Sequence, residues 1–205
     1  MKENPYLSEL VRLSQTQSDI NQHLLVLFYY ASLCRSVVEF GVRGGVSTVA
    51  FFAGLYQRLM ITPGTARYIG FDISPACRSV IDRLRLSDTT EAMQANFFVA
   101  DTKEESTSDL YLLPFQSVDL LFIDTLHDAD QCYHELIHNS DNVDKYIILH
   151  DTEIYAKRGE TPGKPGLNAA IKQWQMERHD WQCSRVFTNN NGLTVFERIN
   201  PEKLK

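Results

Sequence analysis

The chain has 205 residues, of which 43% are hydrophobic and 22% are charged, and this is enough for one well-buried globular domain. Its formal net charge is −6, and no basic stripe interleaved with aromatic residues occurs along it. A nucleic-acid partner held through its phosphates requires such a basic surface, so the composition argues against one.

The N-terminal stretch and the cysteines give a prediction of the cellular compartment. The segment MKENPYLSEL lacks the basic and apolar regions of a signal peptide, and the apolar stretch HLLVLFYYASLC is too short to span a bilayer. These features predict a cytoplasmic protein without a membrane partner. No C-x-x-C pair indicates a zinc or redox centre, so we expect buried thiols at Cys34, Cys77, Cys132 and Cys183.

Apolar runs of strand length alternate along the chain with longer segments of helical spacing, a pattern typical of a largely parallel sheet with crossover helices. Helices are predicted at residues 20–34, 46–60, 75–86, 128–139 and 167–178, with a shorter one near 5–13. Strands are predicted at residues 36–40, 67–71, 96–100, 118–123, 145–149, 183–188 and 193–198.

The last two predicted strands are joined by NNNG, which suits a tight antiparallel hairpin because Asn and Gly tolerate positive φ. We therefore expect an α/β fold with a doubly wound seven-stranded sheet, mostly parallel, with one antiparallel strand near the C-terminus and helices on both faces. A single domain is expected over residues 1–205, with an N-terminal helical extension over 1–35.

Acidic side chains lie at or just after the ends of five consecutive predicted strands. Ligands of open α/β sheets bind beyond the carboxyl ends of the strands. One acid at such a place is often only a helix cap or a turn former, but five at one edge favour a binding site. They are Glu39, Asp72, Asp101, Asp124 and Asp151.

The stretch EFGVRGGVS connects the first strand to the next helix through a glycine-rich turn. Gly41 permits a tight exit from the strand, and Gly44 and Gly45 let a ligand approach backbone N–H groups at the start of the helix. The spacing differs from the G-x-G-x-x-G of dinucleotide-binding proteins. Asp72, at the end of the second strand, suits a ribose diol. A nucleoside ligand without a pyrophosphate fits both facts.

With EFGVRGGVS and FIDTLH…HEL, residues 37–199 resemble the class I S-adenosylmethionine-dependent methyltransferases. Within them they resemble the small branch of cephalosporin hydroxylase-type and macrocin-type O-methyltransferases. The resemblance implies a Rossmann-like core over residues 36–199 and S-adenosylmethionine as cofactor. It implies methyl transfer to a hydroxyl of a small-molecule or sugar-like substrate.

The same resemblance implies roles for individual residues. Glu39 would bind the cofactor or, alternatively, only order the glycine turn through backbone N–H groups. The other implied cofactor contacts are Gly41, Gly45 and Asp124 at the methionine part, Ser47 at its carboxylate, Asp72 at the ribose, and Asp101 with Thr102 at the adenine.

Methyl transfer to a hydroxyl requires alignment of the nucleophile with the methyl group and removal of a proton. In one solution, Asp124 and Asp151 hold a divalent ion such as Mg²⁺ or Mn²⁺. In the other, His127 or His150 is a general base, and DTLH matches the D-x-x-H loop of the family. Asp124, His127 and His150 are thus the catalytic candidates. A nitrogen donor suits Mn²⁺, Fe²⁺ or Zn²⁺ better than Mg²⁺, so His150 leaves the metal open.

Other histidines are expected to have surface or packing roles, although two of them have the i, i+4 spacing of a metal pair. They are His23, His134, His138 and His179, of which His134 and His138 form that pair.

Two alternatives to a methyltransferase remain: a non-catalytic nucleoside-binding domain and an NAD-dependent oxidoreductase. The glycine spacing and the lack of a Tyr-x-x-x-Lys pair disfavour the oxidoreductase.

The Gly- and Pro-rich segment 150–168 is interpreted as a mobile loop near the cofactor edge. The aromatic N-terminal segment is expected to pack on its own domain, and the alternatives are that it covers the pocket or forms a homodimer contact.

Overall fold

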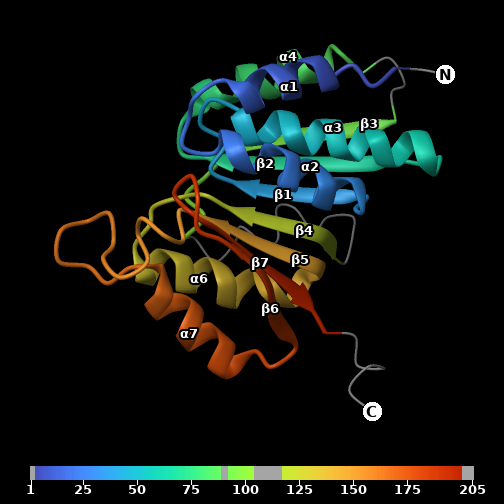
Figure 1. The fold of residues 1–205 in the computed structure, drawn as a ribbon. Coiled ribbons are helices and arrows are strands. Elements are labelled where there is room, and N and C mark those ends of the chain that lie inside the picture. The colour runs from blue at the N-terminus through green and yellow to red at the C-terminus, as the bar shows by residue number, and fades with distance from the viewer. Residues whose placement is uncertain (1–2, 89–91, 104–116, 200–205) are drawn as a thin grey trace.

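The computed structural model describes residues 3–88, 92–103 and 117–199. These residues form one seven-stranded sheet with helices on both faces (Figure 1). The strand order is β3-β2-β1-β4-β5-β7-β6. The pairs from β3 to β5 are parallel, whereas β7 is antiparallel to β5 and to β6. The predicted doubly wound sheet with one antiparallel strand is confirmed.

The observed strands lie close to the predicted ones, and three of them have the predicted bounds. The clearest difference is at β3, which begins at Met93 rather than at residue 96 because it pairs along the whole of β2. The strands are β1 Ser36–Phe40, β2 Ala66–Asp72, β3 Met93–Val99, β4 Val118–Ile123, β5 Val143–His150, β6 Trp181–Phe187 and β7 Leu193–Arg198.

The helices also follow the predicted segments, except that residues 20–34 and 75–86 each begin with a 3-10 turn, at Asn21–His23 (η1) and Pro75–Cys77 (η2). A further 3-10 turn, η3, spans Ser140–Asn142. The described α-helices are α1 Leu7–Gln15, α2 Leu24–Ser32, α3 Val46–Ile61, α4 Arg78–Arg85, α6 Ala129–Asn139 and α7 Leu167–Glu177.

Successive residues of the central strands face opposite sides of the sheet and so enter two different cores. Val37 belongs to the core covered by α1 to α4, whereas Val38 belongs to the core covered by α6 and α7. This two-sided burial explains why the central strands are nearly continuous apolar runs. It also leaves the carboxyl edge of the sheet, where the loops meet, as the place for polar chemistry.

The N-terminal extension packs on its own domain, with α1 and α2 lying against α3. Helix α3 is buried from Ser47 to Tyr56 because the sheet covers one side and these helices cover the other. A homodimer contact through the N-terminal helices stays a prediction. Within the described ranges, no helix is both long and apolar enough to cross a membrane.

The turn between β6 and β7 has the predicted backbone conformation, since Asn190, Asn191 and Gly192 all have positive φ.

The expectation that all four cysteine thiols are buried is wrong for one of them. Cys183 is exposed because it lies on β6, the edge strand of the sheet, whereas the other three cysteines are buried.

Candidate active site

A cavity of about 400 Å³ lies at the carboxyl ends of β1, β2 and β4. Its volume is within the range of small-molecule sites. Five residues predicted to bind the cofactor line it, whereas Glu39, Gly45 and Ser47 are not among its lining residues. The lining consists of Gly41, Arg43, Phe71, Asp72, Ile73, Ala100, Asp101, Thr102, Asp124, Thr125, Leu126 and Gln131.

Neighbouring atoms leave no room for a side chain at two glycines of the turn between β1 and α3. Gly41 has φ +90°, and a Cβ there would lie 1.9 Å from the backbone oxygen of Asp124. Gly45 has φ +75°, and its Cβ would lie 2.1 Å from the Val80 side chain of α4. Gly44 has open space above it. Gly44 is therefore the glycine with free room, and Gly45 packs the turn against α4. A cofactor contact at Gly45 stays a prediction.

Glu39 is fully buried in β1 and accepts hydrogen bonds from Ser47, Thr48 and Tyr68. Burial raises its pKa to about 7, although these three donors favour the ionised form. The acid thus joins β1 and β2 to the first turn of α3 through side-chain hydroxyls rather than through backbone N–H groups. Ser47 donates to Glu39, so its predicted contact with a cofactor carboxylate is not supported by its hydroxyl in this arrangement.

Asp72, at the end of β2, faces the cavity with both carboxylate oxygens held in place. One oxygen accepts from the backbone N–H of Arg43 at 2.8 Å, and the other accepts from that of Ser74 at 2.8 Å. The Cys77 thiol also hydrogen-bonds to this carboxylate, which has about four acceptor positions in all. The side chain is therefore oriented by the backbone of the glycine turn and can still accept from a hydroxyl.

A polar network beside Asp101 and Thr102 includes an acid that is absent from the residues predicted for the site. Glu135 of α6 is fully buried and accepts hydrogen bonds from Thr102, Thr125 and Gln131. Burial raises its pKa to about 7. It lies in the HEL part of the motif, and the signal that could have found it is its i, i+4 spacing from Gln131 on α6.

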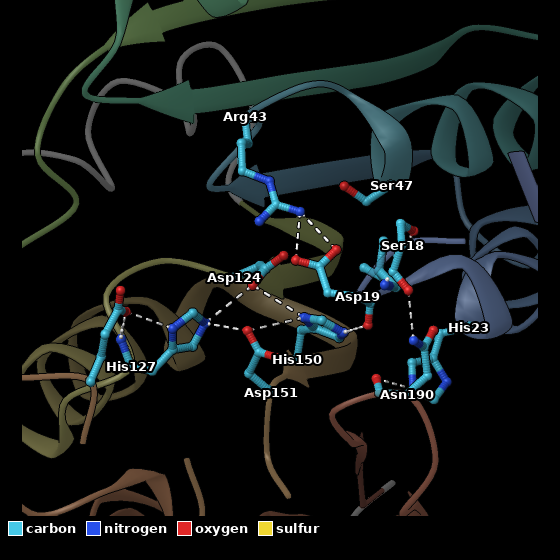
Figure 2. Close-up of polar contacts among 12 residues, drawn as sticks. Ser18, Asp19, His23, Arg43, Ser47, Asp124, His127, His150, Asp151 and Asn190 are labelled. Carbon is cyan, nitrogen blue, oxygen red and sulfur yellow. Dashed lines mark hydrogen bonds and ion pairs between the residues drawn. The ribbon is translucent and has the colours of Figure 1, made fainter. Parts of the chain in front are cut away.

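Asp124, His127, His150 and Asp151 converge at the ends of β4 and β5 (Figure 2). His127 Nε2 lies 2.8 Å from Asp151 Oδ2 and 3.3 Å from Asp124 Oδ1. His150 Nδ1 lies 3.3 Å from Asp124 Oδ1 and 3.5 Å from Asp151 Oδ2. Ligand atoms of Asp124, His127 and Asp151 all lie within 4.8 Å of one another, a spacing that suits a metal ion.

The two histidines and two aspartates of this cluster shift one another's pKa values. Burial disfavours the charged rings, but hydrogen bonds with Asp124 and Asp151 outweigh it and raise the pKa of His127 to about 10 and that of His150 to about 9. Burial also opposes ionisation of both carboxyls, yet the histidines hold the pKa values of Asp124 and Asp151 below their usual range.

Asp151 carries two further signs of a functional position. Its φ is +58°, which is uncommon for a residue with a side chain. Its Oδ1 is buried without a hydrogen-bond partner among the described residues. The neighbouring Thr152 is engaged elsewhere, because its hydroxyl accepts a hydrogen bond from Thr194 at 2.9 Å.

The segment between α1 and α2 reaches the site, although the sequence did not single out Ser18 or Asp19. The Asp19 carboxylate pairs with Arg43 of the glycine turn at 2.7 Å, and the Asp19 backbone oxygen lies 3.2 Å from His150 Nε2. Asn190 of the β6–β7 turn donates to the Ser18 backbone oxygen at 2.8 Å. Figure 2 shows Asp19 between Arg43 and His150, with Ser18 and Asn190 beside it on the side away from His127. Only the fold brings these segments together.

Two other histidine predictions can be compared with the structure. His23 is buried and its Nε2 lies within hydrogen-bond distance of the backbone oxygens of Asn189 and Asn190, so its packing role is confirmed. His134 and His138 lie with ring centroids 4.2 Å apart on α6, outside the catalytic cluster.

Solved structures with this fold include methyltransferases. The O-methyltransferase TomG from Streptomyces achromogenes, crystallised with S-adenosylmethionine, is 15% identical with a TM-score of 0.64, over 97% of this chain and 92% of that chain. An O-methyltransferase from Bacillus cereus in complex with S-adenosylhomocysteine is 14% identical with a TM-score of 0.61, over 97% and 92%. The methyltransferase PaMTH1 from Podospora anserina is 13% identical with a TM-score of 0.58, over 97% and 89%.

At these identities the likeness shows the fold, which is that of the class I methyltransferases. No curated protein gives a significant sequence match. The sequence pattern of one family, described as a methyltransferase domain, matches residues 38–152, which is more than half of the chain. The chain therefore belongs to this family of methyltransferases. The resemblance seen in the glycine turn and the strand-end acids is confirmed.

Proposed function

We propose that this methyltransferase uses S-adenosylmethionine to methylate a hydroxyl group of a small molecule. The observation that carries the proposal is the position of Asp124, which both lines the 400 Å³ cavity and belongs to the cluster with His127, His150 and Asp151. The methyl-donating end of a cofactor bound in the cavity would then lie beside side chains that can accept or donate a proton. TomG and the Bacillus cereus protein, both O-methyltransferases, were crystallised with this cofactor or its product.

The acids of the cavity suit the cofactor's chemistry. Asp72 would accept from the ribose hydroxyls, because backbone N–H groups occupy only one acceptor position on each oxygen and the Cys77 thiol is a weak donor that a hydroxyl can displace. Asp101 and Thr102, with Gln131 behind them, lie at the other end of the lining, where the adenine is proposed to bind. Asp124 would lie at the methionine end, where its negative charge favours a sulfonium cation.

The cluster fits a divalent metal ion. Two carboxylates and the imidazole of His127 place their ligand atoms within 4.8 Å of one another, and His150 Nδ1 lies 3.3 Å from Asp124 Oδ1. The buried Oδ1 of Asp151 has no hydrogen-bond partner among the described residues. Asp124 and Asp151 would hold the ion, with His127 and His150 beside them. An ion bound there would lower the pKa of a substrate hydroxyl. The chain's own contribution is to orient these four side chains and, through Asp124, to align the hydroxyl with the methyl group.

The alternative mechanism, with a histidine as general base, has less support. A base needs a ring nitrogen free to take the substrate's proton, but His127 Nε2 lies 2.8 Å from Asp151 Oδ2 and its Nδ1 lies 2.9 Å from Glu160 Oε2. His150 is only 1% exposed, and both of its ring nitrogens already lie near hydrogen-bond acceptors. These contacts favour the metal-assisted reaction over the histidine base.

Calorimetry with S-adenosylhomocysteine, S-adenosylmethionine and NAD, each with and without Mn²⁺, tests the proposal. Both sulfur ligands should bind and NAD should not. Binding of NAD alone would overturn the proposal, and binding of the sulfur ligands without turnover on any hydroxyl compound would favour a non-catalytic binding domain. EDTA should inhibit turnover reversibly if a metal is used. If EDTA has no effect and His127→Ala loses roughly 10² to 10⁴ in rate, the histidine is the base.

A further inference from the structure

Each histidine of the cluster has one ring nitrogen beside a group that can only accept a hydrogen bond. His127 Nδ1 lies 2.9 Å from Glu160 Oε2, and His150 Nε2 lies 3.2 Å from the backbone oxygen of Asp19. Carboxylate and carbonyl oxygens carry no proton at neutral pH, so these two outer nitrogens must carry the ring protons. In a neutral imidazole, the inner nitrogen then presents a lone pair.

Those inner lone pairs face the two carboxylates of the cluster. His127 Nε2 and His150 Nδ1 each lie between 2.8 and 3.5 Å from the nearest oxygens of Asp124 and Asp151. Two nitrogen and two oxygen acceptors thus converge on one small volume and would repel one another unless a positive charge lies among them. A metal ion supplies that charge, and so does a second proton on each ring.

We propose that Glu160 is a positioning residue that fixes the tautomer of His127, so that both histidines join Asp124 and Asp151 as ligands of a divalent transition-metal ion. The inference rests on the proposed metal-assisted function and adds a nitrogen-containing ligand set and the residue that orients it. Imidazole nitrogen favours Mn²⁺, Fe²⁺ or Zn²⁺ over Mg²⁺, which prefers oxygen ligands. Outer hydrogen bonds of this kind orient metal-bound histidines and raise their basicity.

Glu160 reaches His127 from a segment that is well anchored. The backbone N–H of Thr161, next to Glu160, donates to Asp128 Oδ1 at 2.9 Å, and Pro165 accepts from the Ala129 N–H at 2.9 Å. The segment is therefore tied to the start of α6, two residues after His127.

From the same segment, the Tyr155 ring stacks on the imidazole of His127, with centroids 4.7 Å apart and planes 7° from parallel. Stacking sets the plane of the ring, and Glu160 decides which nitrogen faces inward. The two contacts together define the ring's orientation.

The orientation of His150 is set in the same way from the other side of the site. The backbone oxygen of Asp19 faces its Nε2, and the Asp19 carboxylate is paired with Arg43 at 2.7 Å. Asn190 holds the same segment by accepting from the Gln22 N–H at 2.9 Å. The segment before α2 and the segment after β5 therefore hold the two imidazoles from opposite sides (Figure 2).

Titration of Mn²⁺, followed by the electron paramagnetic resonance of the free ion, tests the proposal at fixed pH. The wild-type protein should bind Mn²⁺ more tightly than Mg²⁺, which is measured by competition. Glu160→Ala should weaken Mn²⁺ binding by about 10- to 100-fold. Glu160→Gln should keep most of the affinity, because the amide oxygen still accepts the proton of Nδ1. Glu153→Ala, an exposed acid of the same segment, is the matched control and should change nothing.

Binding of S-adenosylhomocysteine is measured on every variant and should be unchanged in Glu160→Ala, which shows that the cofactor site is intact. The positioning role is overturned if Glu160→Ala binds Mn²⁺ as tightly as the wild type, or if Glu160→Gln loses as much affinity as Glu160→Ala. It is also overturned if the wild type binds neither Mn²⁺ nor Zn²⁺, in which case both rings are protonated. Failure of the wild type to bind S-adenosylhomocysteine would instead refute the proposed function, whatever the metal result.

Discussion

Replacing Glu39 by Gln tests how a buried acid supports the glycine turn. Glu39 is fully buried, and burial raises its pKa from the ordinary 4.5 to about 7. The folded protein therefore binds this proton more tightly than the unfolded chain does. The stability contributed by the neutral carboxyl is fully present below about pH 4.5 and is lost as the pH rises through about 7. This difference in pKa corresponds to roughly 3 kcal/mol.

Gln has similar size but does not titrate, so Glu39→Gln should remove this pH dependence. Urea unfolding followed by circular dichroism between pH 4.5 and 8 gives the free energy of unfolding of both proteins. The wild type should lose roughly 3 kcal/mol relative to Glu39→Gln across that interval, most of it below pH 7. Subtracting the two curves cancels the titration of all other groups. The exposed acid Glu153, changed to Gln, is the control and should leave the curve unchanged.

A flat difference between the two curves would refute the reasoning. It would mean that Glu39 is ionised in the folded protein and that the donors Ser47, Thr48 and Tyr68 offset its burial completely. In that case Glu39→Gln should be destabilised equally at every pH, because an amide group offers only one acceptor oxygen to three hydroxyls.

Three further predictions concern the site. Asp72→Ala should weaken binding of S-adenosylhomocysteine by about 1–3 kcal/mol, measured by calorimetry, and an unchanged affinity would contradict the ribose assignment. Gly41→Ala should lower the free energy of unfolding by roughly 2–5 kcal/mol, because φ is +90° and the new Cβ would meet the Asp124 backbone; a fully stable variant in urea unfolding would contradict this. Asp151→Ala should abolish Mn²⁺ binding and turnover while S-adenosylhomocysteine still binds, and metal-dependent turnover in this variant would exclude Asp151 as a ligand.

The local sequence determined the strands and helices and many of the acidic residues at the carboxyl edge of the sheet. Apolar runs of strand length are recognisable without tertiary information because burial on both faces of a parallel sheet needs continuous apolar residues. The parallel strands β1 and β4 accordingly have the predicted bounds, and so does the antiparallel strand β7, whose start the NNNG turn marks. Parallel strands also end at the same edge, so the sequence alone indicates that acids following them, such as Asp72 and Asp124, lie near one another.

Tertiary structure decided which groups meet at that edge and why. Gly41 was recognisable as a turn residue, but the cause of its requirement is the Asp124 backbone oxygen on the neighbouring strand. Asp19 and Glu160 reach the two histidines from loops that periodicity does not describe. The physical reason is that chain spacing governs contacts within one helix or strand, whereas contacts between distant segments depend on how whole elements pack.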